Sequence, residues 1–258
     1  MLKYSGIAIL CISTVALTVA HINIEKRLNP YKQHLEKWTY EGQNWAMFKL
    51  RPKSRYETFK QAFTHFFVHN GRTIVELGTS RSFTHGGHPG CNKDDRKYWM
   101  PQAPENWDWG AGFFTRMAAV CLEGSGAIIH TVDLMQRHIE RCKVMTQDYK
   151  SMIRYHVSSS IDYLKACASK SIDLLYLDTG DMTPIEPTAR MQLEEAKIIV
   201  ERNLMSKHGI ILIDDVRHPI TMTTGGGLGK AQYSLPYLLE HGFEIIADEY
   251  QVLLRKKA

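Results

Sequence analysis

The sequence lacks the patterns that mark metal-knuckle, disulfide-framework and nucleic-acid-binding proteins. Its cysteines form no CxxC pair and no Cys/His cluster, and they lie far apart, at Cys11, Cys91, Cys121, Cys142 and Cys167. Such spacing favours neither a zinc knuckle nor a disulfide framework, and free thiols in the body of a domain are typical of a reducing compartment. The net charge of +5 is a mild bias. Because no nucleic-acid-binding motif accompanies it, no nucleic-acid partner is expected.

Two phosphate-binding motifs are also absent. The segment Gly225-Gly-Gly-Leu-Gly229 resembles a phosphate cradle by composition, but the pattern GxxxxGK[ST] is missing, which favours a flexible loop over a site. The stretch Thr73-Ile-Val-Glu-Leu-Gly-Thr-Ser-Arg-Ser82 is an apolar strand that breaks into a turn with a single glycine. A dinucleotide turn needs GxGxxG, so this turn disfavours a pyrophosphate ligand while still suiting another nucleotide-like cofactor.

One long apolar run lies at the N-terminus. Gly6–Ala20 carries no charge, and Tyr4–Ile24 approaches the ~20 residues that span a bilayer. Basic residues after this run outnumber Lys3, which predicts an uncleaved single-pass anchor with the catalytic domain in the cytoplasm. A cleaved signal peptide is the alternative, since Thr18 and Ala20 are small residues suited to a cleavage point. Residues 1–24 are therefore interpreted as a transmembrane anchor or signal segment.

Residues 25–70 form a polar, aromatic-rich segment that we interpret as a helical cap. Tyr56, Phe59, Phe63 and Phe66 recur at the spacing of one helix face, which predicts packing on a core. The basic residues of the segment are expected on a solvated face; they are Lys49, Arg51, Lys53, Arg55 and Lys60.

Residues 71–258 alternate between short apolar runs and helical stretches, which predicts a doubly wound, mostly parallel sheet of seven strands covered on both faces. A long insertion, residues 83–109, follows the first strand and is interpreted as a packed lid. Phe243–Ala247 and Gln251–Arg255 predict a terminal antiparallel pair. The other expected strands are Thr73–Leu77, Ala127–Asp133, Ile153–Val157, Ile172–Asp178 and Gly209–Asp214, and the expected helices are Gly110–Glu123, Arg137–Lys150, Ile161–Ala168, Ala189–Lys207 and Gln232–His241.

Acidic residues lie at or near the ends of four of these strands: Glu76, Asp133, Asp178 and the pair Asp214-Asp215. The carboxyl ends of strands in a doubly wound sheet face one crevice, where the acid after the second strand commonly binds ribose hydroxyls. The last three carboxylates would repel one another unless a cation or protons neutralise them, and oxygen ligands alone suit Mg²⁺ or a similar divalent ion. The alternative is that Asp215 caps its loop and only Asp178 faces the ligand.

Four sequence blocks carry a family resemblance: TIVELGTS at 73–80, IHTVDL at 129–134, IDLLYLD at 172–178 and GIILIDDV at 209–216. In this order they resemble class I S-adenosylmethionine-dependent methyltransferases. The nearest group is the cation-dependent, catechol-type O-methyltransferases, in which an acidic residue ends the fourth strand and an acidic pair or Asp-Asn ends the fifth.

This resemblance implies a role for each matching residue. Glu76, Gly78 and Ser80 would lie along the methionine part of the cofactor, with Asp133 on its ribose. Ser159 and Ser160 would lie beside adenine. The cation ligands would be Asp178, Asp214 and Asp215, and the bound ion would orient a substrate hydroxyl toward the methyl group.

The catechol enzymes place a lysine base three residues after the fourth-strand acid, whereas this chain has Asp181. Either the cation suffices or another group takes the proton; the candidates are His85, His88, His218 and Lys230, and the catalytic set is predicted as Asp178, Lys230 and His218. The predicted function is O-methylation of a sugar, phenol or lipid-linked glycan, with membrane contact through the N-terminal segment. The alternatives are a non-catalytic scaffold of the same fold and an NAD-dependent oxidoreductase.

Overall fold

A computed structural model gives the fold of the chain. The structure describes residues 3–32, 35, 55–79, 112–217 and 227–257, and it gives side-chain surroundings within them from residue 14 onward. Ser80, His85, His88, His218 and the insertion 83–109 lie outside the described residues. Within the described part Cys121, Cys142 and Cys167 are free thiols, as expected.

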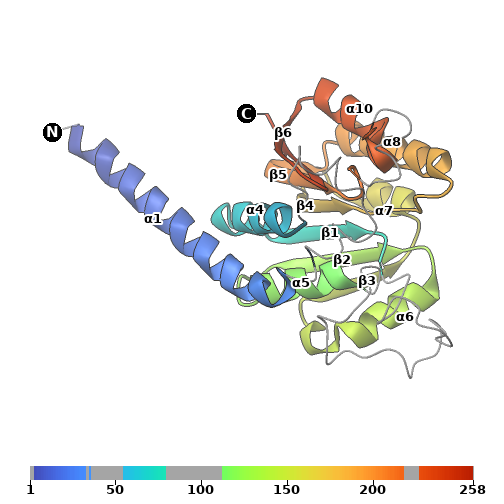
Figure 1. The fold of residues 1–258 in the computed structure, drawn as a ribbon, viewed down its shortest axis with the longest axis horizontal. Helices are drawn as coiled ribbons and strands as arrows, with labels where there is room; N and C mark the ends of the chain where they lie inside the picture. The colour runs from blue at the N-terminus through green and yellow to red at the C-terminus, as the bar shows by residue number, and fades with distance from the viewer. Residues whose placement is uncertain (1–2, 33–34, 36–54, 80–111, 218–226, 258) are drawn as a thin grey trace, which may run out of the picture.

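The centre of the molecule is a seven-stranded sheet in the order β3-β2-β1-β4-β5-β7-β6 (Figure 1). Strands β1 to β5 pair in parallel, and β7 pairs antiparallel with both of its neighbours. The predicted sheet and its terminal antiparallel pair are therefore confirmed. The strands are β1 Thr73–Leu77, β2 Ile128–Asp133, β3 Ile153–Val157, β4 Ile172–Leu177, β5 Met205–Ile213, β6 Phe243–Asp248 and β7 Val252–Lys256.

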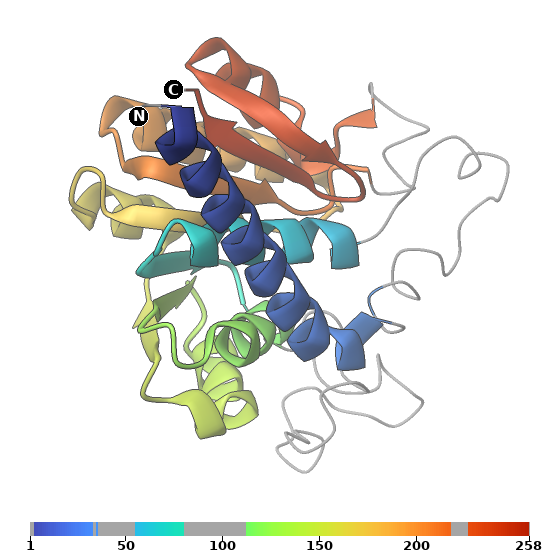
Figure 2. The ribbon, with the colours of Figure 1, turned by 90° about the vertical axis from the view of Figure 1, so that its left-hand side faces the viewer.

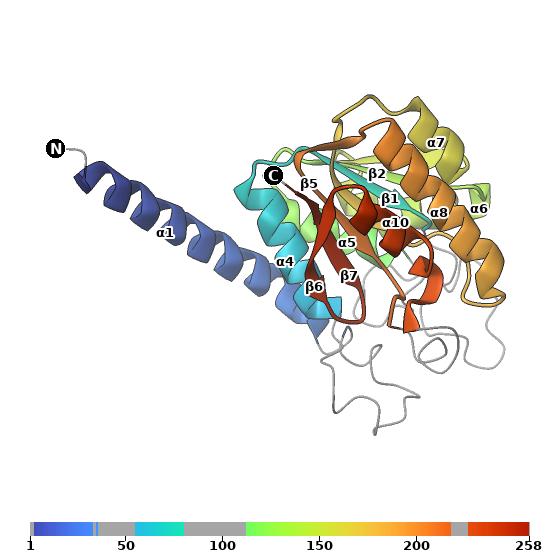
Figure 3. The same ribbon diagram turned by 90° about the horizontal axis from the view of Figure 1, so that it is seen from above.

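Helices cover both faces of the sheet (Figure 3). Because successive side chains of a strand point to opposite faces, Leu174 and Tyr176 of β4 join one core with α4 and α5, whereas Leu175 and Leu177 join a second core with α8 and α10. The helices of the α/β domain are α4 Arg55–Val68, α5 Phe113–Leu122, α6 Gln136–Met145, α7 Ser160–Ala166, α8 Ile185–Glu201 and α10 Ser234–Glu240. Short 3-10 turns lie at Asn29–Tyr31 (η1), Gln147–Tyr149 (η4) and Gly229–Ala231 (η6).

Helix α8 and strand β5 both begin earlier than the sequence pattern predicts. The helix starts at Ile185, because Pro184 at its N-cap and Pro187 in its first turn fit a helix start, where no intrahelical N–H bond is lost. It ends at Glu201, and Asn203, with φ 50°, takes the left-handed conformation that terminates helices. Residues 205–207 therefore belong to β5 and not to the predicted helix.

The prediction of a transmembrane anchor is wrong: among the described residues, no helix is long and apolar enough to cross a membrane. Residues Lys3–Leu28 do form one helix, α1, but Ser13, Thr14 and Thr18 interrupt its apolar run. The helix runs past the predicted boundary at residue 24, and its last turns belong to the protein core.

The end of α1 packs on the α/β domain, as its path across α4 and α5 shows (Figure 2). Ala20, Ile24 and Leu28 are buried in this contact. The guanidinium of Arg27 donates hydrogen bonds to the carbonyls of Cys121 and Glu123, both at 3.0 Å. Residues assigned from sequence to a membrane segment thus contribute to the core of the domain.

The predicted aromatic helix face is present in α4. Tyr56, Phe59, Phe63 and Phe66 are buried in the core shared with β4 and α5. The prediction of a solvated basic face is wrong for Arg55, the first residue of α4, because its side chain is only 3% exposed and is bound to carboxylates. This one residue connects the helical cap to the polar end of the sheet.

Candidate cofactor and acceptor site

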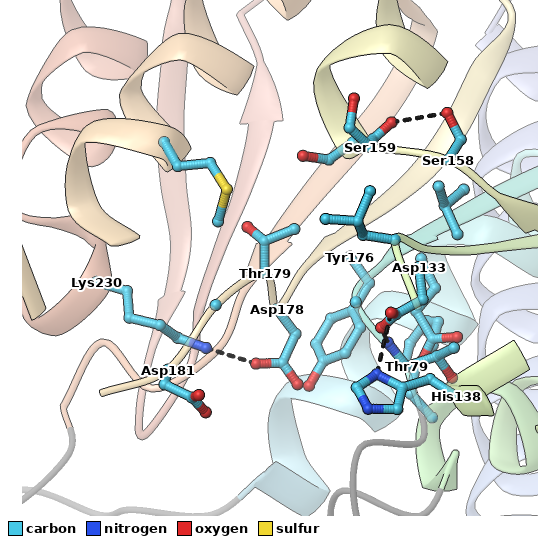
Figure 4. A pocket seen from close by; sticks show the side chains of 18 of the residues that line it. Thr79, Asp133, His138, Ser158, Ser159, Tyr176, Asp178, Thr179, Asp181 and Lys230 are labelled. Atoms are coloured by element: carbon cyan, nitrogen blue, oxygen red, sulfur yellow. Dashed lines mark hydrogen bonds and ion pairs between the residues drawn. The ribbon is translucent and has the colours of Figure 1, made fainter. Parts of the chain in front are cut away.

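A cavity of about 340 Å³ opens at the carboxyl ends of β1, β2, β3 and β4 (Figure 4). Strands β2 and β3 lie on one side of β1, whereas β4 and β5 lie on the other, so the direction in which the chain adds strands changes here. Such a switch point is the usual ligand position in a doubly wound sheet. Of the predicted site residues, the lining contains Glu76, Gly78, Asp133, Ser159, Ser160, Asp178, Asp215 and Lys230. Buried Asp214 lies directly behind, bound to the same cation as Asp215.

Gly78 closes the turn after β1 against the end of β4. Its φ of 90° is one that side chains other than glycine rarely adopt, and a Cβ at this position would lie 2.6 Å from the carbonyl oxygen of Asp178. Its N–H donates to the carbonyl of Val132. The single glycine of the turn therefore brings three strand ends together beside the cavity.

Asp133, the last residue of β2, holds the two loops that border the cavity. One carboxylate oxygen accepts from the N–H of Thr79 at 3.0 Å, and the other accepts from the N–H of Met135 at 2.8 Å and contacts Nδ1 of His138 at 3.0 Å. A carboxylate has about four acceptor positions, so these contacts leave capacity for a bound hydroxyl. The geometry suits the ribose contact that the resemblance implies.

Serines 159 and 160 begin helix α7 at the cavity wall. Ser159 is the N-cap, and its hydroxyl exchanges hydrogen bonds with the N–H and the carboxylate of Asp162. Leu134, which also lines the cavity, is 67% exposed. The exposed apolar side chain of Leu134 and the polar groups of the serines together suit an adenine ring, which has apolar faces and polar edges.

Glu76 is buried inside the site instead of projecting freely into it. Its Oε2 accepts hydrogen bonds from the hydroxyls of Thr115 and Thr131, the second at 2.5 Å. Burial raises the pKa of Glu76 to about 7, and the threonine hydrogen bonds offset only part of that effect. Near neutral pH this carboxyl group therefore holds or releases a proton easily.

The three carboxylates predicted to bind a cation do converge. Oxygens of Asp178, Asp214 and Asp215 lie within 4.8 Å of one another. Arg55 binds Asp214 through two hydrogen bonds of 3.0 Å, from Nε and Nη2, and Nη2 also donates to Asp215 at 3.0 Å. The carboxylate of Asp214 is thus already in a bidentate ion pair inside the protein.

Lys230 supplies a second cation to the same group (Figure 4). Its Nζ lies 2.6 Å from Oδ1 of Asp178 and 3.1 Å from Oδ2 of Asp215. Burial alone would lower the pKa of Lys230, but the neighbouring carboxylates outweigh it and raise that pKa above its ordinary value. A lysine in this state retains its proton, which argues against the predicted role as a general base.

Burial raises the pKa of Asp178 to about 6, although Lys230 acts in the opposite direction. Asp178 is therefore a stronger base than an ordinary aspartate and faces the cavity directly. Its neighbour Asp181 also lines the cavity, at the position where catechol-type enzymes have a lysine. Of the groups that the structure describes here, Asp178 is the best placed to accept a proton.

Several functional candidates were not identified from sequence. Arg55 and Tyr250 contact the acidic group from far away in the chain: Arg55 lies 159 residues from Asp214, and the Tyr250 hydroxyl donates to Asp215 at 2.7 Å. His138 could have been found, because it lies only five residues after Asp133, in the first turn of α6. Glu195 is buried behind Thr179, and burial raises its pKa to about 7.

Comparison with known proteins identifies the fold. No protein-family model matches the chain, and no curated protein matches it. Solved structures do. A protein from Staphylococcus aureus assigned as a caffeoyl-CoA O-methyltransferase has a TM-score of 0.54 at 13% identity, covering 92% of this chain and 97% of its own. The SAH-bound methyltransferase PaMTH1 from Podospora anserina has a TM-score of 0.51 at 12% identity, covering 100% and 97%.

Cofactor-bound Rv0187 from MTB is similar to the same degree, with a TM-score of 0.53 at 13% identity over 93% of this chain and 88% of its own. Likeness at such low identity is a likeness of fold. Together with the strand order, it shows that this chain has the class I methyltransferase fold, with solved O-methyltransferases among its structural neighbours.

Proposed function

We propose that the chain is an S-adenosylmethionine-dependent O-methyltransferase that acts on a hydroxyl group. One observation carries the proposal: a cavity lies at the reversal of strand order in a class I methyltransferase fold, and Gly78, Asp133 and Asp178 line it at the ends of β1, β2 and β4. Structural neighbours that bind SAH or are assigned as O-methyltransferases support it.

The residues present fit this cofactor. Asp133 would accept hydrogen bonds from ribose hydroxyls, Leu134 and Ser159 would border adenine, and Gly78 with Glu76 would lie along the methionine part. When bound, S-adenosylmethionine supplies an electrophilic methyl group. The protein's own contribution is to orient the acceptor hydroxyl and to remove its proton.

Asp178 is the group that we propose for proton removal. Asp178 faces the cavity, and its raised pKa of about 6 makes it more basic than an exposed aspartate. Lys230, which lies against Asp178, would stabilise the negative charge on the acceptor oxygen. His218, the other predicted base, lies outside the described residues. A phenol, a sugar or a lipid-linked glycan remains the proposed class of acceptor.

Cation assistance stays a prediction. The approach of three carboxylates within 4.8 Å supports it. The ion pairs of Arg55 with Asp214 and of Lys230 with Asp178 weigh against it, because they engage the oxygens that a metal would need.

Isothermal calorimetry on the full chain tests the proposal. We expect S-adenosylhomocysteine to bind, and NAD, the ligand of the alternative oxidoreductase function, to give no heat of binding. Absence of S-adenosylhomocysteine binding up to millimolar concentration would refute the methyltransferase assignment.

A scaffold that binds cofactor without catalysis is the remaining alternative, and activity separates it from an enzyme. Radiolabelled methyl transfer from S-adenosylmethionine is measured on a panel of phenols and sugars, with wild type and Asp178→Ala side by side. Transfer that is lost in the variant identifies an enzyme; a protein that binds the cofactor and labels none of the panel fits a scaffold.

A further inference from the structure

We infer that Lys230 is a built-in cation that occupies the place of a divalent ion among Asp178, Asp214 and Asp215, so that the folded chain closes this acidic trio to Mg²⁺. This inference rests on the proposed function. It assigns to the ammonium group of Lys230 the electrostatic role that a metal ion has in the cation-dependent enzymes. Its binding consequence can be measured without any methyl acceptor.

The contacts around the trio leave little oxygen surface for a metal. Lys230 lies against Asp178 and Asp215 at 2.6 and 3.1 Å, and Arg55 engages both oxygens of Asp214 and one of Asp215. Mg²⁺ requires oxygens at about 2.0–2.1 Å in near-octahedral geometry. A metal among these carboxylates would have to displace hydrogen bonds that are already formed.

The backbone holds Lys230 in this position. Gly229 precedes it with a φ of 55°, and a Cβ there would lie only 2.2 Å from the carbonyl oxygen of Asp215. Only glycine permits this approach, and it brings the 3-10 turn η6 directly against the loop after β5 that carries Asp214 and Asp215. The side chain of Lys230 is 1% exposed, so it is enclosed and has no room to swing into solvent.

Electrostatics argue in the same direction. Three ionised carboxylates with Arg55 and Lys230 leave one net negative charge in a buried region. A divalent ion added to that group would lie a few ångströms from an ammonium group, where like charges repel strongly in a low-dielectric environment. Binding of the metal therefore requires Lys230 to leave.

The ammonium group can replace the metal in methyl transfer. It has three N–H donors, of which the two carboxylates take two, and we assign the third to the acceptor oxygen. In the balanced step the acceptor O–H proton passes to Asp178, the new O–CH₃ bond forms, and the S–CH₃ bond breaks with its electron pair returning to sulfur. Lys230 stabilises the negative charge that develops on oxygen.

Mn²⁺, a spectroscopic substitute for Mg²⁺, is the probe for the test. The full-length wild type, Lys230→Met and the control Lys207→Met, which alters an exposed lysine outside the trio, are titrated and followed by electron paramagnetic resonance. We expect no saturation of the wild type or the control below millimolar Mn²⁺. Lys230→Met should bind at least about tenfold more tightly, and adding Asp178→Asn should remove that gain.

The inference is overturned if the wild type binds Mn²⁺ with a Kd near or below about 10 μM, the range of dedicated oxygen-ligand sites, or if Lys230→Met binds no more tightly than the wild type. Should Lys230→Met fail to fold, the wild-type titration alone still decides. Calorimetry with S-adenosylhomocysteine on the wild type keeps the two proposals apart. Absence of binding by the wild type refutes the proposed function, whereas the Mn²⁺ titrations test the inference about Lys230.

Discussion

At the scale of single residues, Asp133 joins the loops after β1 and β2 and offers its carboxylate to the cavity. We predict that Asp133→Ala weakens binding of S-adenosylhomocysteine at least about tenfold, because a hydrogen bond to a charged group contributes about 1.5–3 kcal/mol. Calorimetry measures the change, and Asp148→Ala, which alters an exposed acid that pairs with Arg116 and does not line the cavity, is the control. Equal affinity in wild type and Asp133→Ala would contradict the ribose contact.

Gly78 and Gly124 form a matched pair, since both have a φ near 80–90° but only Gly78 meets another atom at the Cβ position. Both alanine variants incur the cost of the left-handed conformation, about 1–2 kcal/mol. We predict that Gly78→Ala loses clearly more stability in urea unfolding than Gly124→Ala, and also loses cofactor binding. Equal losses would show that the contact with Asp178 is not tight.

The buried carboxyl group of Glu76 should make the free energy of unfolding depend on pH. Burial raises its folded-state pKa from 4.5 to about 7, so its contribution is fully present below pH 4.5 and is lost as the pH rises through 7. Relative to Glu76→Gln, the wild type should therefore lose roughly 3 kcal/mol of unfolding free energy across that window. Urea unfolding at several pH values checks this, with exposed Glu123→Gln as control. Parallel profiles for wild type and Glu76→Gln would contradict it.

The sequence located the acids of the site and Lys230, but it did not locate Arg55, which pairs with Asp214 and Asp215. Asp178, Asp214 and Asp215 were predictable because acidic residues at the ends of parallel strands meet at one edge of the sheet. Arg55 was not, because its basic neighbours in the sequence suggest a solvated face and its contact with Asp214 spans 159 residues. Only the packing of α4 across the sheet brings this arginine to the trio.

At the scale of elements, α1 combines a core helix with an exposed one. Leu28 is fully buried, whereas Leu17, three turns earlier, is 48% exposed. We predict that Leu28→Ala lowers the unfolding free energy by about 2–5 kcal/mol, while Leu17→Ala changes it by no more than about 0.5 kcal/mol. Urea unfolding of the two variants measures both effects, and equal effects would contradict the docking of α1.

The same helix shows why apolar runs mislead. A run of apolar residues near twenty in length is compatible with a membrane span and with a helix that packs on a domain, and the pattern alone does not separate them. Ala20, Ile24 and Leu28 repeat every four residues, the spacing of a single helix face. That spacing, continuing past the charged residues at 25–27, was the signal for packing in the sequence.

At the scale of the whole molecule, sequence reasoning recovered the strands along the chain and their mostly parallel arrangement, but it predicted no order of the strands within the sheet. Parallel strands buried on both faces read as short apolar runs, and the change of pattern after α10 marked the antiparallel pair. Element limits were less predictable where prolines begin α8 and where β5 extends over polar residues Ser206–His208, because tertiary pairing decides such ends.

The central claim is that S-adenosylmethionine binds where β1, β2 and β3 end. Hydrogen–deuterium exchange of the full chain, with and without S-adenosylhomocysteine, tests it most directly. The account predicts slower exchange at 77–79, 134–138 and 158–161, the segments that border the cavity, and unchanged exchange at 205–208 on the opposite edge of the sheet. Unchanged exchange in all three cavity segments at millimolar ligand would contradict it.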